Sequence, residues 1–474
     1  MKPFASIALA LGALISTGAQ AVDTFDIPTN LLTLQSVATG GQTYFNASVT
    51  VGSYSQLSVA GGIPAADTFD PATNFLTLGS VAAGGQAYNN VRVHIDSYRL
   101  NSVATAPNMV PVTVDAGPTG NSINVLFGSV TVCKPGSQAQ CQTIDHLLLD
   151  TGSTGLRVLS SVLSPSLGLP VANGPTGLPL LNCAQFLDSS FTWGPMVNAD
   201  VSLGANTATN LPIQVIADPK YNALSSNCGT GFANDSISAL GAKGILGIGL
   251  FQQDCGAACV NRVNNGVYFT CTSAACSNVV ATKLGLGQQL QNPVGAMVND
   301  NNGIVIDLPS VSGAGAPSVA GAMYLGIGTQ GNNPLGTATV LKTDGNGYIT
   351  TSFEGKNLTT SFIDSGSNGT YFDLATIKQC TSNNLSGFYC PAAATSFAAI
   401  NVGTNGASTS LFFSVDDANK QLSRLANSVF PLLAGTVGDS QTFDWGLPFF
   451  LGRRVFIGFE GKATGSVQGT FFAY

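Results

Sequence analysis

The 474-residue sequence predicts a mainly β fold, with two short β-rich repeats ahead of a larger body made of two lobes. Three observations support this prediction. Charged residues make up 9 % of the chain, hydrophobic residues make up 44 % and glycine occurs 56 times, which is typical of folded β structure with many turns and not of disorder. A motif near the N-terminus recurs after 44 residues. An aspartate turn that follows a strand-like segment occurs twice, at residues 150–153 and 364–367.

The N-terminus has the three parts of a secretory signal peptide, which we assign to residues 1–21. Lys2 supplies the positive charge, residues 4–15 are apolar, and residues 19–21 (Ala-Gln-Ala) form a small-residue cleavage site. About 12 apolar residues are too few to span a bilayer. We therefore expect an exported chain, in the periplasm or outside the cell, with no membrane span after processing.

Residues 22–62 and 63–106 form the two predicted repeats. The tetrapeptide Asp-Thr-Phe-Asp at residues 23–26 recurs at residues 67–70, and both copies place β-forming residues around Gly-Gly turns. We interpret the pair as an appended β-module with no catalytic role. A surface-binding or secretion-related role is the functional alternative.

Ten cysteines, an even number in an exported chain, predict up to five disulfides. Spacing suggests pairs of sequence neighbours, although the four cysteines of residues 255–276 are also close enough to pair crosswise. A zinc site is not expected, because it needs Cys-x-x-Cys pairs or clustered histidines. The candidate pairs are Cys133 and Cys141, Cys183 and Cys228, Cys255 and Cys259, Cys271 and Cys276, and Cys380 and Cys390.

The larger body is predicted to consist of two lobes, residues 108–297 and 298–474. Each lobe supplies one aspartate, Asp150 or Asp364, at the point where a buried strand gives way to a tight turn. In both turns a glycine two residues later allows close approach of the backbone, and the next serine can hydrogen-bond the carboxylate. One such turn is ordinary turn chemistry. Two copies in one chain predict a paired-carboxylate site.

Each turn is followed, further along the chain, by an apolar-apolar-Gly segment. These segments are residues 244–247 (Gly-Ile-Leu-Gly) and residues 450–452 (Phe-Leu-Gly). Together, the paired turns and segments resemble the pepsin-like aspartic proteases of the retropepsin/pepsin clan, and the resemblance implies that each segment forms a strand beside its turn. The resemblance covers roughly residues 108–474. The same core is similar to a bacterial family of secreted proteins without an assigned function.

The resemblance implies a bilobal acid-protease β-barrel fold in which the catalytic residues Asp150 and Asp364 hold the nucleophilic water. It also implies that the serine ending each turn orients an outer carboxylate oxygen. The residue after each aspartate is implied to buttress the turns across the lobe interface. The implied dyad-supporting residues are Thr151, Gly152, Ser153, Ser365, Gly366 and Ser367.

The family carries a substrate-covering flap with a tyrosine before a glycine, and Trp193 and Gly194 stand at that place. We therefore predict them as flap and substrate-binding residues, with the indole N–H of Trp193 in place of a phenol O–H. The alternative is an ordinary half-buried packing tryptophan. Arg157 stands where the family usually has a tryptophan that supports the flap.

Two carboxyl groups within hydrogen-bond distance share one proton, because like charges so close cannot both ionise cheaply. One group then acts as base toward water and the other as acid toward the leaving nitrogen, and they exchange roles through the cycle. The sequence thus predicts an aspartic endopeptidase that acts on a peptide or protein substrate without a metal or other cofactor. We expect a monomer.

Other hypotheses have weaker support. A net charge of −7 without a basic run argues against nucleic-acid binding. A serine or cysteine hydrolase needs a base, but His94 lies in the repeats, and His146 lies about 13 Å from Asp150 along an extended strand, so we interpret it as structural. Residues 342–349 resemble the middle of a calcium loop, but Lys342 and Phe353 stand where such a loop needs carboxylates. A glycoside hydrolase leaves the paired turns unexplained. The main alternative is a catalytically inactive peptide- or surface-binding module with the same fold.

Overall fold

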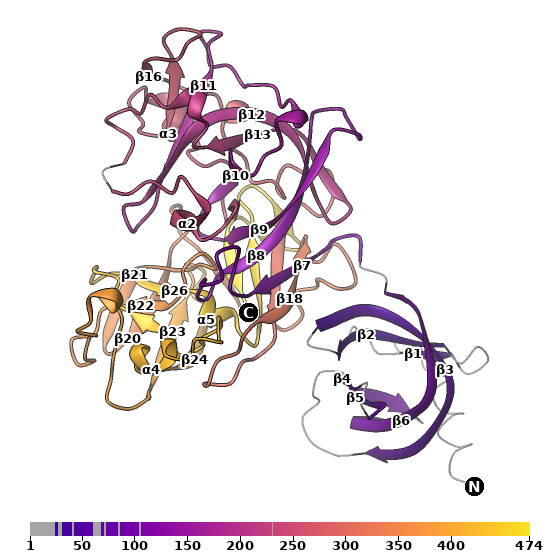
Figure 1. Cartoon of the computed structure of the whole chain (residues 1–474). Coiled ribbons are helices and arrows are strands. Elements are labelled where there is room, and N and C mark those ends of the chain that lie inside the picture. Colours follow the sequence, from indigo (N-terminus) through magenta and orange to yellow (C-terminus); the bar gives the residue numbers. More distant parts are fainter. Residues whose placement is uncertain are drawn as a thin grey trace. The chain divides into compact units, whose positions relative to one another are not determined.

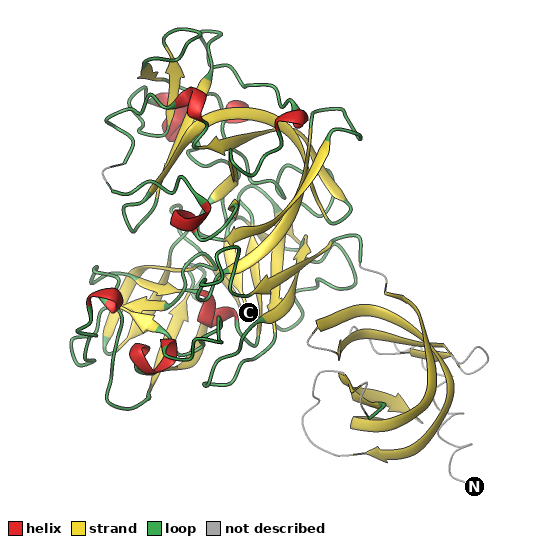
Figure 2. Cartoon of the chain, in the orientation of Figure 1, coloured by secondary structure: helices red, strands yellow, loops and turns green. Residues whose placement is uncertain are grey.

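The computed structural model describes residues 24–26, 31–39, 42–59, 68–70, 73–83, 86–103, 106–229 and 231–474. The predicted signal peptide, residues 1–21, lies outside this part. The chain divides into two compact units, Met1–Met109 and Val110–Tyr474. Strands dominate both units and the helices are short, which confirms the mainly β prediction (Figures 1 and 2). The finer domain boundaries remain predictions. None of the described helices has the length and apolar character needed to cross a membrane.

The described residues of the first unit form a six-stranded sheet in which two sets of three strands follow one pattern. Each set has strands of 3, 9 and 18 residues, and corresponding strands begin 44 residues apart. The order is β1-β2-β3-β6-β5-β4, and β2 also pairs with β4. The strands are β1 (Thr24–Asp26), β2 (Leu31–Thr39), β3 (Gln42–Val59), β4 (Thr68–Asp70), β5 (Phe75–Ala83) and β6 (Gln86–Val103).

In the second unit, strands in the order β8-β9-β14-β10-β13-β12 close into a barrel, because β12 pairs with both β13 and β8. Alternating side chains fill it: Ala199, Val201 and Leu203 of β12 are buried, and the residues between them are partly exposed. The barrel strands are β8 (Leu126–Cys133), β9 (Cys141–Asp150), β10 (Thr154–Leu159), β12 (Phe191–Leu203), β13 (Asn206–Ile216) and β14 (Gly244–Ile248). Beyond β12 follow β11 (Leu180–Gln185), β15 (Tyr268–Cys271) and β16 (Val279–Ala281).

From β8 the same sheet continues through strands in the order β7-β18-β17-β27-β30-β19, which we call the connecting strands. β17 pairs antiparallel with β18 and β27. Its run Ile304-Val305-Ile306 is buried on both faces, as expected for a strand covered on both sides. The connecting strands are β7 (Met109–Val114), β17 (Gly303–Leu308), β18 (Val319–Leu325), β19 (Val340–Lys342), β27 (Arg453–Gly458) and β30 (Phe471–Ala473).

A second sheet, within residues 349–445, has seven strands in the order β24-β23-β20-β21-β26-β22-β25. Aromatic side chains fill its core: the Phe443 ring stacks on Phe372 at 4.9 Å and on Trp445 at 4.2 Å. The strands are β20 (Ile349–Phe353), β21 (Lys356–Ile363), β22 (Thr370–Phe372), β23 (Thr395–Val402), β24 (Ser408–Val415), β25 (Ala434–Gly435) and β26 (Phe443–Trp445).

The remaining elements are short. The α-helices of the described residues are α2 (Ile237–Leu240), α3 (Ala257–Asn261), α4 (Ala418–Leu422) and α5 (Leu447–Phe450), and β28 (Ala463–Thr464) pairs with β29 (Val467–Gln468). Single 3₁₀ turns occur at Pro165–Leu167, Pro219–Tyr221, Leu286–Gln288 and Asn383–Leu385.

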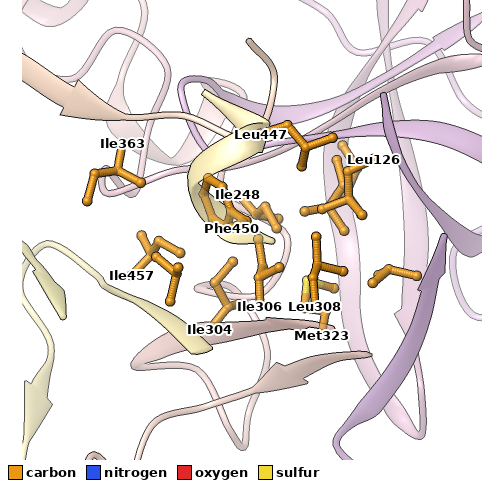
Figure 3. Packing of buried hydrophobic residues seen from close by; sticks show 14 of the residues in the cluster. Leu126, Ile248, Ile304, Ile306, Leu308, Met323, Ile363, Leu447, Phe450 and Ile457 are labelled. Carbon is orange, nitrogen blue, oxygen red and sulfur yellow. The ribbon is translucent and has the colours of Figure 1, made fainter. Parts of the chain in front are cut away.

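One hydrophobic cluster joins the barrel, the connecting strands and the second sheet. Figure 3 shows Ile304, Ile306 and Leu308 of β17 grouped with Ile248, which ends β14. Ile363, the last residue of β21, belongs to the same cluster. Because Ile248 and Ile363 lie next to the two aspartate turns, both turns rest on one shared core.

All ten cysteines lie in the described residues and form five disulfides, which confirms the disulfide prediction. The middle four pair with their sequence neighbours and not crosswise. The pairs are Cys133–Cys141, Cys183–Cys228, Cys255–Cys259, Cys271–Cys276 and Cys380–Cys390.

The buried disulfide Cys183–Cys228 should contribute most to stability, because it closes the longest loop, with a sequence separation of 45. Replacing both cysteines by alanine is expected to lower the free energy of unfolding by about 4 kcal/mol. In the control, replacing Cys255 and Cys259, which have a sequence separation of 4, should lower the free energy of unfolding by about 2 kcal/mol by the same chain-entropy argument. Denaturant unfolding under oxidising conditions measures both values, and equal losses would contradict the prediction.

Candidate active site

Asp150 lies at the end of β9, held by two neighbouring strands of the barrel. β14 runs parallel to β9 and places Gly247 opposite Asp150, and β10 returns antiparallel along β14. A Cβ atom on Gly247 would lie 2.8 Å from both the Ser153 hydroxyl oxygen and the backbone of Thr154. Only glycine therefore lets β14 pass this close to the turn, as the apolar-apolar-Gly pattern predicted.

Asp364 follows β21 in the same arrangement, but the partner strand differs from the predicted one. β26 runs parallel to β21 and pairs Trp445 with Ile363, so Gly446 is the residue beside Asp364. A Cβ atom on Gly446 would overlap the carbonyl oxygen of Gly369. The prediction that residues 450–452 form this strand is wrong. Those residues end α5 and lead through Gly452, at φ 78°, into β27.

The two turns cross so closely that each glycine lies against the carboxyl group of the other turn. A Cβ atom on Gly152 would lie 2.7 Å from the Asp364 Cγ atom, and one on Gly366 would lie 2.5 Å from the Asp150 Oδ1 atom. The Asp150 carboxyl group is close enough to raise the pKa of Asp364. The structure thus brings together two aspartates that are 214 positions apart, and a side chain at either glycine would separate them.

Reciprocal hydrogen bonds tie the turns together beneath the carboxyl groups. Thr151 Oγ1 accepts from the Ser365 N–H at 2.9 Å and donates to the Ile363 carbonyl at 3.3 Å. Ser365 Oγ accepts from the Thr151 N–H at 3.2 Å and donates to the Leu149 carbonyl at 2.6 Å. Both hydroxyl groups are buried, so water cannot replace these bonds.

Both carboxylates receive the same set of donors from their own turns. The N–H groups of Gly152 and Gly366 donate to the Oδ1 atoms of Asp150 and Asp364 at 2.9 and 2.8 Å. The outer Oδ2 atoms accept from Ser153 in the first turn and from Ser367, at 3.2 Å, in the second. These donors leave each carboxyl group in a fixed orientation.

A third carboxyl group, Asp444 on β26, belongs to this site and was missed in the sequence. Ser367 Oγ lies 2.6 Å from its Oδ2 atom. Burial raises the pKa of Asp444 to about 8, against the opposing effect of the Ser367 hydrogen bond and with a further contribution from Asp150. The sequence did contain a signal for it, because Asp444 lies between two aromatic residues, Phe443 and Trp445, directly before Gly446.

The carboxyl groups of the site are enclosed but not sealed from solvent. Asp150 is buried, Asp364 is partly exposed, and Gly152 between them is exposed. The pKa of Asp364 is raised well above its ordinary value, first by burial and then by the neighbouring carboxyl groups of Asp150 and Asp444. The pair therefore retains a proton at a pH at which an isolated carboxyl group has lost it.

The structure corrects the flap prediction for Trp193 and Gly194. Both lie inside the uninterrupted strand β12, paired with β11, and the chain turns at residues 186–190 instead. Trp193 is buried, its indole N–H donates to the Tyr221 carbonyl at 3.0 Å, and its ring contacts Phe269. Trp193 is therefore a core residue, which is the packing alternative.

Arg157 is buried as well, within a polar network of the first half of the unit. Its guanidinium lies 3.4 Å from the carboxylate of Asp254, which also accepts from Tyr268 and, at 3.1 Å, from Asn182. Burial raises the pKa of Asp254, and the Arg157 charge opposes this. Arg157 thus holds a buried carboxylate in place.

His146 remains a structural residue in our interpretation. Its ring packs edge-on against Phe127 and bonds Asp145 at 3.0 Å. Over the described ranges, no cluster of three or more His, Cys, Asp or Glu side chains is arranged to hold a metal ion.

The hydroxyl of Thr151 should be essential for holding the turns together. Thr151→Val keeps the shape but leaves the Ser365 N–H and the Ile363 carbonyl without partners, which should cost about 2–4 kcal/mol. Thr151→Ser keeps the hydroxyl and removes one methyl group, so its cost should stay near 1 kcal/mol. Denaturant unfolding of the two variants tests this. If valine is tolerated as well as serine, the hydrogen bonds do not hold the turns.

Comparison with known proteins gives the family of the chain. No curated protein matches the sequence. A family model described as "Protein of unknown function (DUF3443)" matches residues 104–474, which include both aspartate turns, Asp444 and the cross-turn hydrogen bonds. Since this match spans most of the sequence, the chain belongs to the DUF3443 family.

Proposed function

We propose that this chain is an exported aspartic endopeptidase of pepsin-like, bilobal architecture, in which Asp150 and Asp364 activate one water for peptide-bond hydrolysis. The observation that carries the proposal is the crossing of the two turns, in which Gly152 and Gly366 each lie against the opposite carboxyl group. Two carboxyl groups held this close share a proton, and that is the state that acid–base hydrolysis needs.

The two carboxyl groups share one proton, and we describe the reaction with that proton on Asp364, which leaves Asp150 as the base. In the proposed reaction, water attacks the carbonyl carbon of the scissile bond while Asp150 accepts a proton from that water. Asp364 gives its proton to the carbonyl oxygen, and a tetrahedral diol forms. Asp150 then protonates the leaving nitrogen, Asp364 takes a proton back from the diol, and the C–N bond breaks. Both carboxyl groups return to their starting states without a cofactor.

The proposed export has independent support from the five disulfides. Disulfides persist in oxidising compartments such as the periplasm or the extracellular space. The substrate in this proposal is a peptide or an unfolded protein segment. A catalytically inactive peptide- or surface-binding module is the competing hypothesis, and the following experiment separates the two.

Cleavage of a denatured protein pool between pH 3 and 7 tests the proposed activity. Wild type should cleave, pepstatin should inhibit, and Asp150→Asn or Asp364→Asn should lower the rate by at least about 10²-fold. Because the pKa of Asp364 is raised, the singly protonated pair persists above the ordinary carboxyl range. Activity should therefore extend above pH 4 and fall as the pH rises through the upper pKa of the pair.

The control for this experiment is Asp439→Asn, the same substitution at an exposed aspartate, which should leave the rate unchanged. If a folded, disulfide-intact wild type cleaves nothing at any pH, the proposed activity is wrong. The binding module is then the hypothesis to pursue.

A further inference from the structure

Asp444 is a buried acid for which the two-carboxyl mechanism has no use. It is 4 % exposed on β26, and its Oδ1 atom is buried without a hydrogen-bond partner. Its Oδ2 atom lies 2.6 Å from Ser367 Oγ, which lies 3.2 Å from the Asp364 Oδ2 atom. Ser367 therefore bridges Asp364 and a third carboxyl group.

Ser367 can bridge Asp364 and Asp444 by hydrogen bonds only if one of these two carboxyl groups is protonated. A serine hydroxyl has one hydrogen, so it can donate to one of the two carboxyl oxygens and must accept from, or repel, the other. If Asp364 and Asp444 were both ionised, one negative oxygen would face the lone pairs of Ser367. One of the two carboxyl groups therefore carries a proton on the side that faces Ser367.

Asp444 is the better place for that proton. An ionised Asp444 would leave a charged oxygen, Oδ1, buried and unpaired, which costs far more than an unpaired neutral carbonyl oxygen. The described titratable groups that act on its charge are Asp150 on β9, Asp364 after β21 and Tyr371, its register partner on β22. None of these groups is cationic. The pKa of Asp444, raised by burial to about 8, agrees with this argument.

We propose that Asp444 is a positioning residue, a neutral acid whose O–H donates a hydrogen bond to Ser367 Oγ. The Ser367 hydroxyl then donates its own hydrogen bond to Asp364 and not to Asp444. This inference rests on the proposed function, since it concerns the same carboxyl pair. When Asp444 loses its proton, the Ser367 hydroxyl turns to it, and Asp364 loses its outer hydrogen bond. Asp444 thus limits activity on the alkaline side.

The first turn has no third carboxyl group, so the two turns can be compared. Strand register places Ile245 of β14 where β26 has Asp444, each two residues before the glycine that lies beside an aspartate. Ser153 nevertheless donates to Asp150. The third carboxyl group therefore acts on one side of the pair only, through Ser367 on Asp364.

Thermal unfolding between pH 5 and 8 tests the proton without requiring activity. The folded pKa of Asp444 lies above its unfolded value, so stability falls as the pH rises toward about 8. Asp444→Asn, the isostere of the protonated acid, removes this loss. The Tm difference between Asp444→Asn and wild type should grow by at least ~2 °C from pH 5 to 8. The exposed control Asp439→Asn should show no growth. A constant or shrinking difference for Asp444→Asn overturns the inference.

The pH profile of cleavage tests whether Asp444 acts on Asp364 through Ser367. In Asp444→Asn the introduced amide can donate to Ser367 at every pH, so the alkaline midpoint of kcat should rise by roughly one pH unit, with KM unchanged. If Asp444 were ionised in the working range, its removal would lower the pKa of Asp364 and move the midpoint down. An unchanged or lowered midpoint therefore overturns the inference. If wild type cleaves nothing, the proposed function fails, and the thermal comparison still decides whether Asp444 holds a proton.

Discussion

The reciprocal hydrogen bonds between Thr151 and Ser365 are the constraint on which the rest of the site depends. Each hydroxyl accepts from the backbone of the opposite turn and donates to the strand that leads into it. Because these groups are buried, separating the turns would leave them unpaired. The bonds therefore oppose the electrostatic repulsion between Asp150 and Asp364, which would otherwise push the turns apart.

Bringing carboxyl groups together in a buried place has a direct consequence for their protons. Repulsion and loss of hydration both favour the neutral form, and the structure places no cation among the groups that act on Asp364. The carboxyl groups of the site consequently keep protons at a pH at which isolated carboxyl groups have lost them. Asp444 extends this property, since its burial makes a second proton stable close to the first. The protein is therefore less stable at high pH, where these carboxyl groups lose their protons, and the proposed chemistry uses the protonated form that burial favours.

Much of the site follows from local sequence, and the remainder depends on pairing between distant strands. The aspartate turns and the strand containing Gly247 could be predicted, because glycine is required wherever backbone passes within contact of a turn. β26 was not predicted, because Asp444 interrupts its apolar pattern and the strand was predicted in the longer apolar run after Gly446, which forms α5. Trp193 was misplaced for a related reason: only its pairing with β11 shows that β12 is continuous there.

The central claim is that Asp150 and Asp364 act as one proton-sharing pair on one substrate. Calorimetric titration of a statine-type transition-state mimic into wild type and Asp364→Asn at pH 5 tests it most directly. The hydroxyl of such a mimic occupies the place of the attacking water between the two carboxyl groups. We predict tight binding to wild type and a loss of at least about 10²-fold in the variant. Equally tight binding to both would contradict the claim and indicate a cleft that binds peptides without the pair.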